Sequence, residues 1–146
     1  MGRELEREGN SIRSRKSDHI HICLNENVEA KNVTTGFEEI FFIHRALPEL
    51  NLEKIDLSTE VFGHKFSAPI MISSITGGAE ESLKINASIA EAVEDLGLGM
   101  GIGSQRAALE DPDLRRTYTI VREKAPSAFL AANIGAPQII RDYGIE

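Results

Sequence analysis

Residues 69–106 read PIMISSITGGAEESLKINASIAEAVEDLGLGMGIGSQR, and this stretch decides the fold. It opens with a short apolar run, 69–73, which predicts a strand that leads into a polar, glycine-rich turn. In 82–96 the apolar residues recur at helical spacing, and Gly97 follows as a C-terminal cap. Residues 98–103 predict a second short strand. The stretch therefore predicts a strand, a loop, a helix and another strand in succession.

The same order of segments continues further along the chain. Asp111-Pro112 predicts the start of a second helix that runs through Val121, because an acidic N-cap followed by proline favours a first helical turn. Residues 129–132 predict a third strand, and we expect a third helix to begin near Pro137. Repeated strand–loop–helix units indicate right-handed crossovers and a parallel sheet. Two α/β architectures fit, a doubly wound sheet and a (β/α)8 barrel, and both bind ligands at the carboxyl ends of their strands.

Two other features precede the parallel units. Residues 1–35 are polar and of mixed charge, which predicts an N-terminal arm with little core of its own and a short helical piece. Between Ile55 and Val61 apolar residues alternate with polar ones, and Gly63-His64 is a turn signal, so a β-hairpin is expected. Residues 36–146 then form the α/β part of the chain.

The composition limits the classes of function. The chain has 146 residues and a net charge of −7, which argues against a general nucleic-acid partner or an anionic membrane. Phosphate binding therefore has to come from a local basic cluster or from backbone N–H groups. The single cysteine, Cys23, cannot form an internal disulfide, and it fits a reducing, cytoplasmic compartment. No apolar run approaches the ~20 residues that span a bilayer, so no membrane segment is expected.

A polar cluster follows each predicted strand. Residues 73–78 offer hydroxyl groups and a backbone that a flat or anionic ligand can approach closely. Glycines alternate from 99 to 103 and leave room on one strand face, and residues 104–106 then add a hydroxyl, an amide and a cation suited to phosphate. Asn133 can donate to and accept from the edge of a heteroaromatic ring. Each cluster alone also fits a plain turn or a close-packed strand.

A fourth cluster is basic and lies in the arm. Arg13, Arg15 and Lys16 precede His19 within seven positions of sequence. Such a group of cations beside a histidine can clamp a diphosphate, because arginine in particular binds phosphate oxygens with two parallel hydrogen bonds. The alternative interpretation is a solvated tail.

Several motifs together resemble one family, the FMN-dependent type 2 isopentenyl-diphosphate isomerases. In chain order these motifs are RKSDHI, TGFEEI, HRALPEL, SSITGG, GIGSQR and AANIGA. The resemblance implies an FMN-binding (β/α)8 TIM barrel, incomplete here, with the arm, the hairpin and about three βα units. It implies interconversion of isopentenyl and dimethylallyl diphosphate in isoprenoid biosynthesis, with reduced FMN, NADPH and Mg²⁺. It also implies a cytoplasmic homo-oligomer when the protein is complete.

The resemblance also assigns residues to the substrate and to the flavin. The implied substrate-binding residues are Arg15, Lys16, Ser104, Gln105 and Arg106, with His19 as a further contact. The implied FMN-binding residues are Ser74, Ile75, Thr76, Ser104 and Asn133. It assigns no catalytic or metal-ligating residue to this chain, since the Mg²⁺-binding glutamate and the glutamine before it are expected beyond Glu146.

Three other interpretations remain open from the sequence. The first is another FMN-dependent barrel oxidoreductase, similar to a 2-hydroxy-acid oxidase. The second is a non-enzymatic fragment that binds phosphate and needs a partner chain to supply missing strands, and the third is a small doubly wound binding domain. A full barrel needs about 250 residues, so the chain is expected to be a truncated product or one piece of a split gene, inactive alone.

Overall fold

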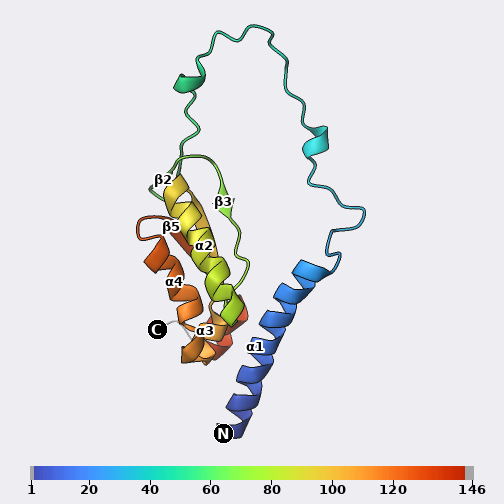
Figure 1. Ribbon diagram of the computed structural model, residues 1–146, viewed down its shortest axis with the longest axis vertical. Coiled ribbons are helices and arrows are strands. Elements are labelled where there is room, and N and C mark those ends of the chain that lie inside the picture. The colour runs from blue at the N-terminus through green and yellow to red at the C-terminus, as the bar shows by residue number, and fades with distance from the viewer. Residues whose placement is uncertain (1, 144–146) are drawn as a thin grey trace.

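The computed structural model describes the backbone of residues 2–143 and the side chains of residues 14–140. A long N-terminal helix and a small α/β body are joined by an extended segment, 26–58 (Figure 1). The helices and strands are α1 (Gly2–Asn25), β1 (Thr59–Val61), β2 (His64–Phe66), β3 (Met71–Ile72), α2 (Glu80–Leu96), β4 (Gly99–Ser104), α3 (Arg106–Glu110), α4 (Arg116–Lys124) and β5 (Phe129–Asn133). Short 3-10 turns lie at Phe37–Glu39, Leu52–Lys54 and Pro112–Leu114, and a π-helical turn lies at Gln138–Tyr143.

The body is built on a three-stranded parallel sheet in the order β3-β4-β5. Met71 lies opposite Gly99, and Gly99 lies opposite Phe129, so the three strands start in step and their carboxyl ends meet at one edge. Helices α2 and α4 pack side by side against the sheet and bury a core around Val93, Met100 and Val121. The predicted α/β class, the three strands and the parallel pairing are confirmed.

Local sequence signals explain where α2 begins and ends. The hydroxyl of Ser82 accepts a hydrogen bond from the Ala79 N–H (3.1 Å), and Glu80 and Glu81 place negative charge in the first turn, where the helix dipole favours it. Gly97 takes a left-handed conformation (φ 63°, ψ 42°) and closes the helix as predicted. The helix thus sets the position of the turn that precedes it, residues 76–78.

The predicted hairpin is present, with its turn one residue earlier than expected. Strands β1 and β2 pair antiparallel, and the turn residues are Phe62 (φ 50°) and Gly63 (φ 77°). Two consecutive positive φ angles match the right-handed twist of a tight hairpin. The rings of Phe62, His64 and Phe66 all lie within stacking distance of Phe129, so the hairpin covers the amino end of the sheet.

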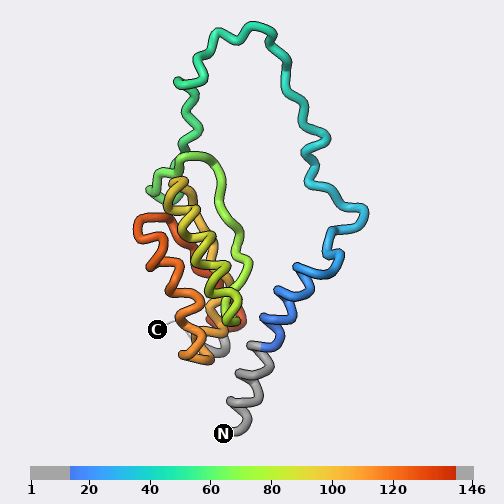
Figure 2. Tube along the Cα trace, viewed as in Figure 1, coloured from blue at the N-terminus to red at the C-terminus, as the bar shows by residue number. Residues whose placement is uncertain are grey.

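The N-terminal arm differs most from expectation. A short helical piece was predicted there, but α1 is a continuous helix from Gly2 to Asn25 that contacts α3 (Figure 1). The segment after it, 26–58, extends away from the body (Figure 2). It exposes large apolar side chains, among them Phe41 (86% exposed), Phe42 (94%) and Ile43 (91%). Isolated apolar residues are common on surfaces, but four in succession, Ile40 to Ile43, form a contiguous exposed apolar patch.

The region between β4 and β5 is divided more finely than predicted. One helix from residue 111 through Val121 was expected, whereas α3, a 3-10 turn and α4 follow one another. The break lies at Asp111, whose carboxylate accepts from the Asp113 N–H (3.0 Å) and caps the 3-10 turn that Pro112 opens. Among the described residues the strands do not close a barrel, and no helix there is long and apolar enough to cross a membrane.

Candidate functional site

The turn between β3 and α2 is held by buried side chains. Asn86 of α2 donates through Nδ2 to the carbonyl of Thr76 (3.3 Å) and to that of Thr117 (2.8 Å). The Oγ1 of Thr117 in turn accepts from the Gly78 N–H (2.9 Å). Gly78 has a φ of +86°, a conformation that glycine adopts without steric cost. The backbone of this turn is therefore fixed by α2 and α4.

The alternating glycines of β4 do leave room on one strand face, as predicted, but the protein itself fills that room. A Cβ atom at these glycines would collide, in chain order, with the ring of Phe66, with Ser74 and with the backbone of Thr76. The loop after β3 therefore lies directly against β4. The glycines act by letting two predicted ligand-binding loops approach each other.

The carboxyl ends of β4 and β5 bring together residues that are far apart in the sequence. Ser104 pairs with Asn133 in the sheet, and the Gln105 N–H donates to the Asn133 carbonyl (2.7 Å). The Gln105 side chain turns back and donates through Nε2 to the Gly103 carbonyl (3.0 Å). The prediction that these strand ends lie together is confirmed.

A basic cavity of about 340 Å³ lies between α1 and these strand ends. Its lining residues are Arg15, Lys16, His19, Ser104, Arg106 and Ala107. Four of the five predicted substrate-binding residues are brought together here, along with His19, although about 90 positions of sequence separate the two groups. Gln105 is not among the lining residues, and the side chain of Arg13 lies outside the described residues. Ala107 was not predicted as a lining residue, because its side chain carries no polar group.

The electrostatics of the cavity favour an anion. Burial, and then the neighbouring charge of Arg15, lower the pKa of Lys16 below its ordinary value. Arg106 forms an ion pair with Glu110, with 2.6 Å between Nε and Oε1, and its side chain remains 48% exposed. Arg15 and Lys16 thus lie close enough to repel each other. Neighbouring cations of this kind are typical of sites that bind phosphate groups.

The predicted flavin residues lie along the same edge of the sheet. Ser74, Ile75 and Asn133 are exposed, with Ile75 at 55%, and Ser104 is half-buried. Thr76 is only 3% exposed, and its Oγ1 has no hydrogen-bond partner among the described residues. An exposed aliphatic surface bordered by hydroxyl and amide groups fits one part of a flavin, since such rings need apolar contact and polar groups at their edges.

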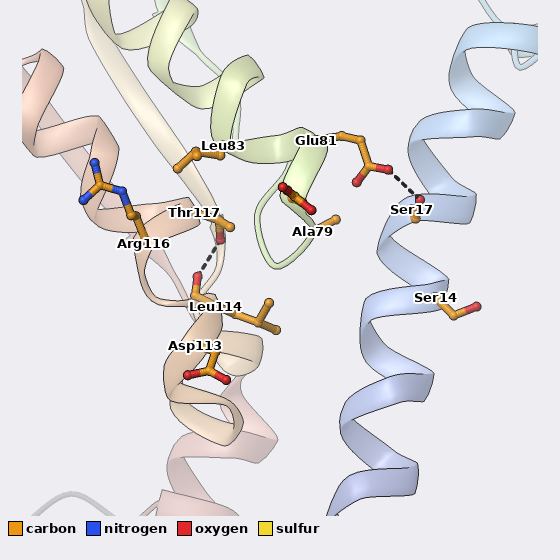
Figure 3. Close-up of a pocket in the computed structure, with 10 residues that line it drawn as sticks. Ser14, Ser17, Ala79, Glu81, Leu83, Asp113, Leu114, Arg116 and Thr117 are labelled. Carbon is orange, nitrogen blue, oxygen red and sulfur yellow. Dashed lines mark hydrogen bonds between the residues drawn. The ribbon is translucent and has the colours of Figure 1, made fainter.

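A second cavity, of about 570 Å³, lies between α1 and the residues around the starts of α2 and α4, and it was not predicted (Figure 3). Carboxylates of Glu80, Glu81 and Asp113 line it, and the hydroxyl of Ser17 donates to Glu81 (3.1 Å) across it. It is larger than the basic cavity, but its acidic lining is unsuited to a phosphate ligand. Within residues 14–140 no group of three His, Cys, Asp or Glu side chains is arranged so that it could hold a metal ion.

Comparisons with known proteins agree with the resemblance seen in the motifs. The family model of FMN-dependent dehydrogenases matches residues 10–113. The chain is 48% identical over 136 residues to an isopentenyl-diphosphate delta-isomerase of Methanococcoides burtonii, covering 93% of this chain and 37% of that protein. It is 55% identical over 133 residues to the protein of that name from Ignicoccus hospitalis, and the match covers 91% of this chain and 36% of that protein. To the protein of that name from Archaeoglobus fulgidus it is 54% identical over 136 residues, and the match covers 93% of this chain and 39% of that protein.

These matches confirm the resemblance to isopentenyl-diphosphate isomerases. The chain spans less than two fifths of the length of the curated relatives it matches. The matched region of the family model contains the arm's basic residues, the turn after β3 and the Ser-Gln-Arg sequence after β4. The chain belongs to the family of FMN-dependent dehydrogenases.

Proposed function

We propose that this chain is part of an enzyme that interconverts isopentenyl diphosphate and dimethylallyl diphosphate on FMN. The observation that carries the proposal is the basic cavity, in which Arg15 and Lys16 of α1 meet Ser104 and Arg106 beside the strand ends. Relatives named isopentenyl-diphosphate delta-isomerase, 48–55% identical, support the same reaction.

Charge supports a diphosphate as the group that this cavity binds. The chain has a net charge of −7, yet two arginines and a lysine line this one cavity. A bound diphosphate would offset the repulsion between Arg15 and Lys16 and would raise the lowered pKa of Lys16, so that Lys16 binds as a cation. The hydroxyl of Ser104 adds a neutral donor beside these charges.

Residues next to the cavity are proposed to hold the flavin. Ser74, Ile75, Thr76, Ser104 and Asn133 border the strand ends where the isoprene part of such a substrate would lie. FMN, when bound, supplies the proton chemistry that an unactivated alkene requires, and the reaction involves no net oxidation. The chain's own contribution is to anchor the diphosphate and hold the alkene beside the flavin site.

Several finer proposals rest on the family resemblance alone. They are a complete (β/α)8 barrel, the division into an arm at 1–35 and a barrel part at 36–146, NADPH as the reductant, and Mg²⁺ on the substrate diphosphate. A role for Gln105 at the substrate, a cytoplasmic location and a homo-oligomeric assembly belong to the same group.

The test uses a completed protein, in which residues 1–146 are joined in register to the remaining part of the Archaeoglobus fulgidus relative. We expect it to purify with FMN and, once the flavin is reduced, to convert isopentenyl diphosphate to dimethylallyl diphosphate. Arg106→Ala should raise the KM about ten- to a hundredfold, because a charge-assisted hydrogen bond contributes about 1.5–3 kcal/mol, while the flavin content stays unchanged. Arg116→Ala, an exposed arginine of the acidic cavity, is the matched control and should behave as the unsubstituted protein.

The rival function is that of an FMN-dependent oxidoreductase acting on a 2-hydroxy acid. The family model supports only its coarser part, since its description names FMN-dependent dehydrogenases. The same completed protein separates the two. Reduction of its flavin by a 2-hydroxy acid, without isomerisation of isopentenyl diphosphate, would replace the proposal by this rival. Equal losses of flavin and substrate binding in Arg106→Ala would refute the role given to Arg106.

A further inference from the structure

Tyr118 of α4 contacts both loops that border the basic cavity. Its Oη donates to the carbonyl of Ser104 (3.0 Å) at the end of β4. Its ring lies against Gly77, where an added Cβ would come within 2.6 Å of Cζ, and its hydroxyl would lie 2.9 Å from a Cβ at Gly78. One side chain, only 4% exposed, therefore joins the turn after β3 to the end of β4.

Gly78 lies between Tyr118 and two residues that line the basic cavity. A Cβ atom there would lie 2.8 Å from the Cβ of Ala107 and 3.8 Å from the Cγ of Lys16. Lys16, Ser104 and Ala107 all line the basic cavity. Tyr118 itself does not line it, so it lies one layer beneath and supports the residues that do.

Neighbouring side chains fix the same turn without reaching Ser104. Asn86 and Thr117 bond to the backbone of Thr76 and Gly78, and Thr117 also donates to the Leu114 carbonyl (2.7 Å). These contacts set the turn relative to α2 and α4. Tyr118 differs because its hydroxyl bonds to the backbone of the Ser104 loop, whereas the hydrogen bonds of Asn86 and Thr117 in the described structure go to Thr76, Gly78, Leu114 and Thr117.

We propose that Tyr118 is a positioning residue for the diphosphate site, whose hydroxyl sets the distance between the turn after β3 and the Ser104–Arg106 loop. The inference rests on the proposed function, since it requires that the basic cavity binds a diphosphate. Removing the hydroxyl would free the Ser104 carbonyl and let the loop that carries Ser104 and Arg106 shift relative to Lys16. Small displacements of this kind weaken a site whose donors must converge on one ligand.

The protonation state of Tyr118 suits this role. Burial raises the pKa of Tyr118 to about 12, so the hydroxyl stays a hydrogen-bond donor throughout the neutral range. Phenylalanine would fill the same space, so packing alone does not require the hydroxyl. The oxygen is explained by its bond to the Ser104 carbonyl.

The experiment measures the binding of inorganic pyrophosphate to the full chain and to the completed protein by titration calorimetry. Tyr118→Phe should weaken pyrophosphate binding about three- to tenfold, because the net contribution of one hydrogen bond is about 0.5–1.5 kcal/mol. In the completed protein the KM for isopentenyl diphosphate should rise by the same factor, with a smaller change in kcat. Thr119→Val, on the exposed side of the same helix, is the matched control and should stay within about twofold of the unsubstituted protein.

A second variant keeps the test decisive if Tyr118→Phe does not fold. A fluorinated tyrosine at position 118 retains the shape and the hydroxyl but ionises at lower pH, and a phenolate cannot donate to Ser104. Pyrophosphate affinity should then fall with rising pH more steeply than in the unsubstituted protein, which a packing role alone would not cause. Unchanged affinity in both variants would overturn the inference. No pyrophosphate binding by the unsubstituted completed protein would instead refute the proposed function, and the inference with it.

Discussion

At the scale of single residues, Gly78 combines a left-handed backbone with close neighbours, so a side chain there is costly for two separate reasons. A Cβ there meets Ala107 and Tyr118, and the backbone has a φ of +86°. Gly78→Ala should therefore cost about 1 kcal/mol for backbone strain and a further 1–3 kcal/mol for overpacking. We expect a lower free energy of unfolding in urea and a loss of pyrophosphate binding larger than that of Tyr118→Phe.

Gly36 provides a matched control for that substitution. Its φ is +80°, close to that of Gly78, but nothing lies within 4 Å of a Cβ added there. Gly36→Ala should carry the backbone cost alone, about 1 kcal/mol at most, and should leave pyrophosphate binding unchanged. If the two alanine variants unfold at the same urea concentration, the close packing of Gly78 contributes nothing and the account of this turn is wrong.

At the scale of the elements, α1 is the part of the basic site that packs least on the body. Ser17 bonds to Glu81 at the surface, and the Cγ of Lys16 lies 3.8 Å from the position that a Cβ at Gly78 would take. Surface interactions of this kind contribute about 1 kcal/mol or less each, so α1 should not be needed for the body to fold. Deleting residues 1–25 should leave the circular dichroism of the remaining helices and strands intact and lower pyrophosphate affinity more than tenfold.

The double variant Arg15→Ala with Lys16→Ala tests whether the charges of α1, and not its bulk, cause that loss. It keeps the helix and removes two cations from the cavity. Its pyrophosphate affinity should match that of the deletion within about threefold. Binding by the deletion variant as tight as in the unsubstituted chain would show that α1 plays no part in the site. The same result in the double variant alone would show that the charges of Arg15 and Lys16 do not cause the loss.

Some helices, strands and contacts could be predicted from the sequence, and others could not. The three parallel strands, α2 with its Gly97 cap and the hairpin depend on local signals, namely apolar runs, glycine and alternation, and these were predicted. The extent of α1 was not, because its polar sequence lacks a strong apolar periodicity. The role of Tyr118 could not be predicted either, since its partners Gly77 and Ser104 lie 41 and 14 positions away and nothing local indicates the pairing. The charges of the basic residues in α1 indicated a diphosphate as one possibility, and the family resemblance implied it, but only the fold brings these residues beside Arg106.

At the scale of the whole molecule, the segment 26–58 is the feature that the described body does not explain. Phe41, Phe42 and Ile43 are almost fully exposed, and within residues 2–143 the outer sides of β3 and β5 have no strand partner. Exposed apolar runs and open strand edges both favour association with other protein surfaces. The proposed barrel would cover the sheet edges and would offer apolar surface to this segment.

Phe42→Ser is therefore expected to act differently in the 146-residue chain and in the completed protein. In the 146-residue chain, where Phe42 is 94% exposed, it should reduce self-association in sedimentation experiments and leave the stability of the body unchanged. In the completed protein, where a buried phenylalanine is expected, it should lower the free energy of unfolding by about 3 kcal/mol or more. Lys54→Ser, in the same segment, should be neutral in both because a solvated lysine leaves no cavity. The expected loss of stability depends on burial of Phe42. An unchanged free energy of unfolding for Phe42→Ser in the completed protein would therefore mean that the barrel leaves this segment in solvent, and the proposed packing would be wrong.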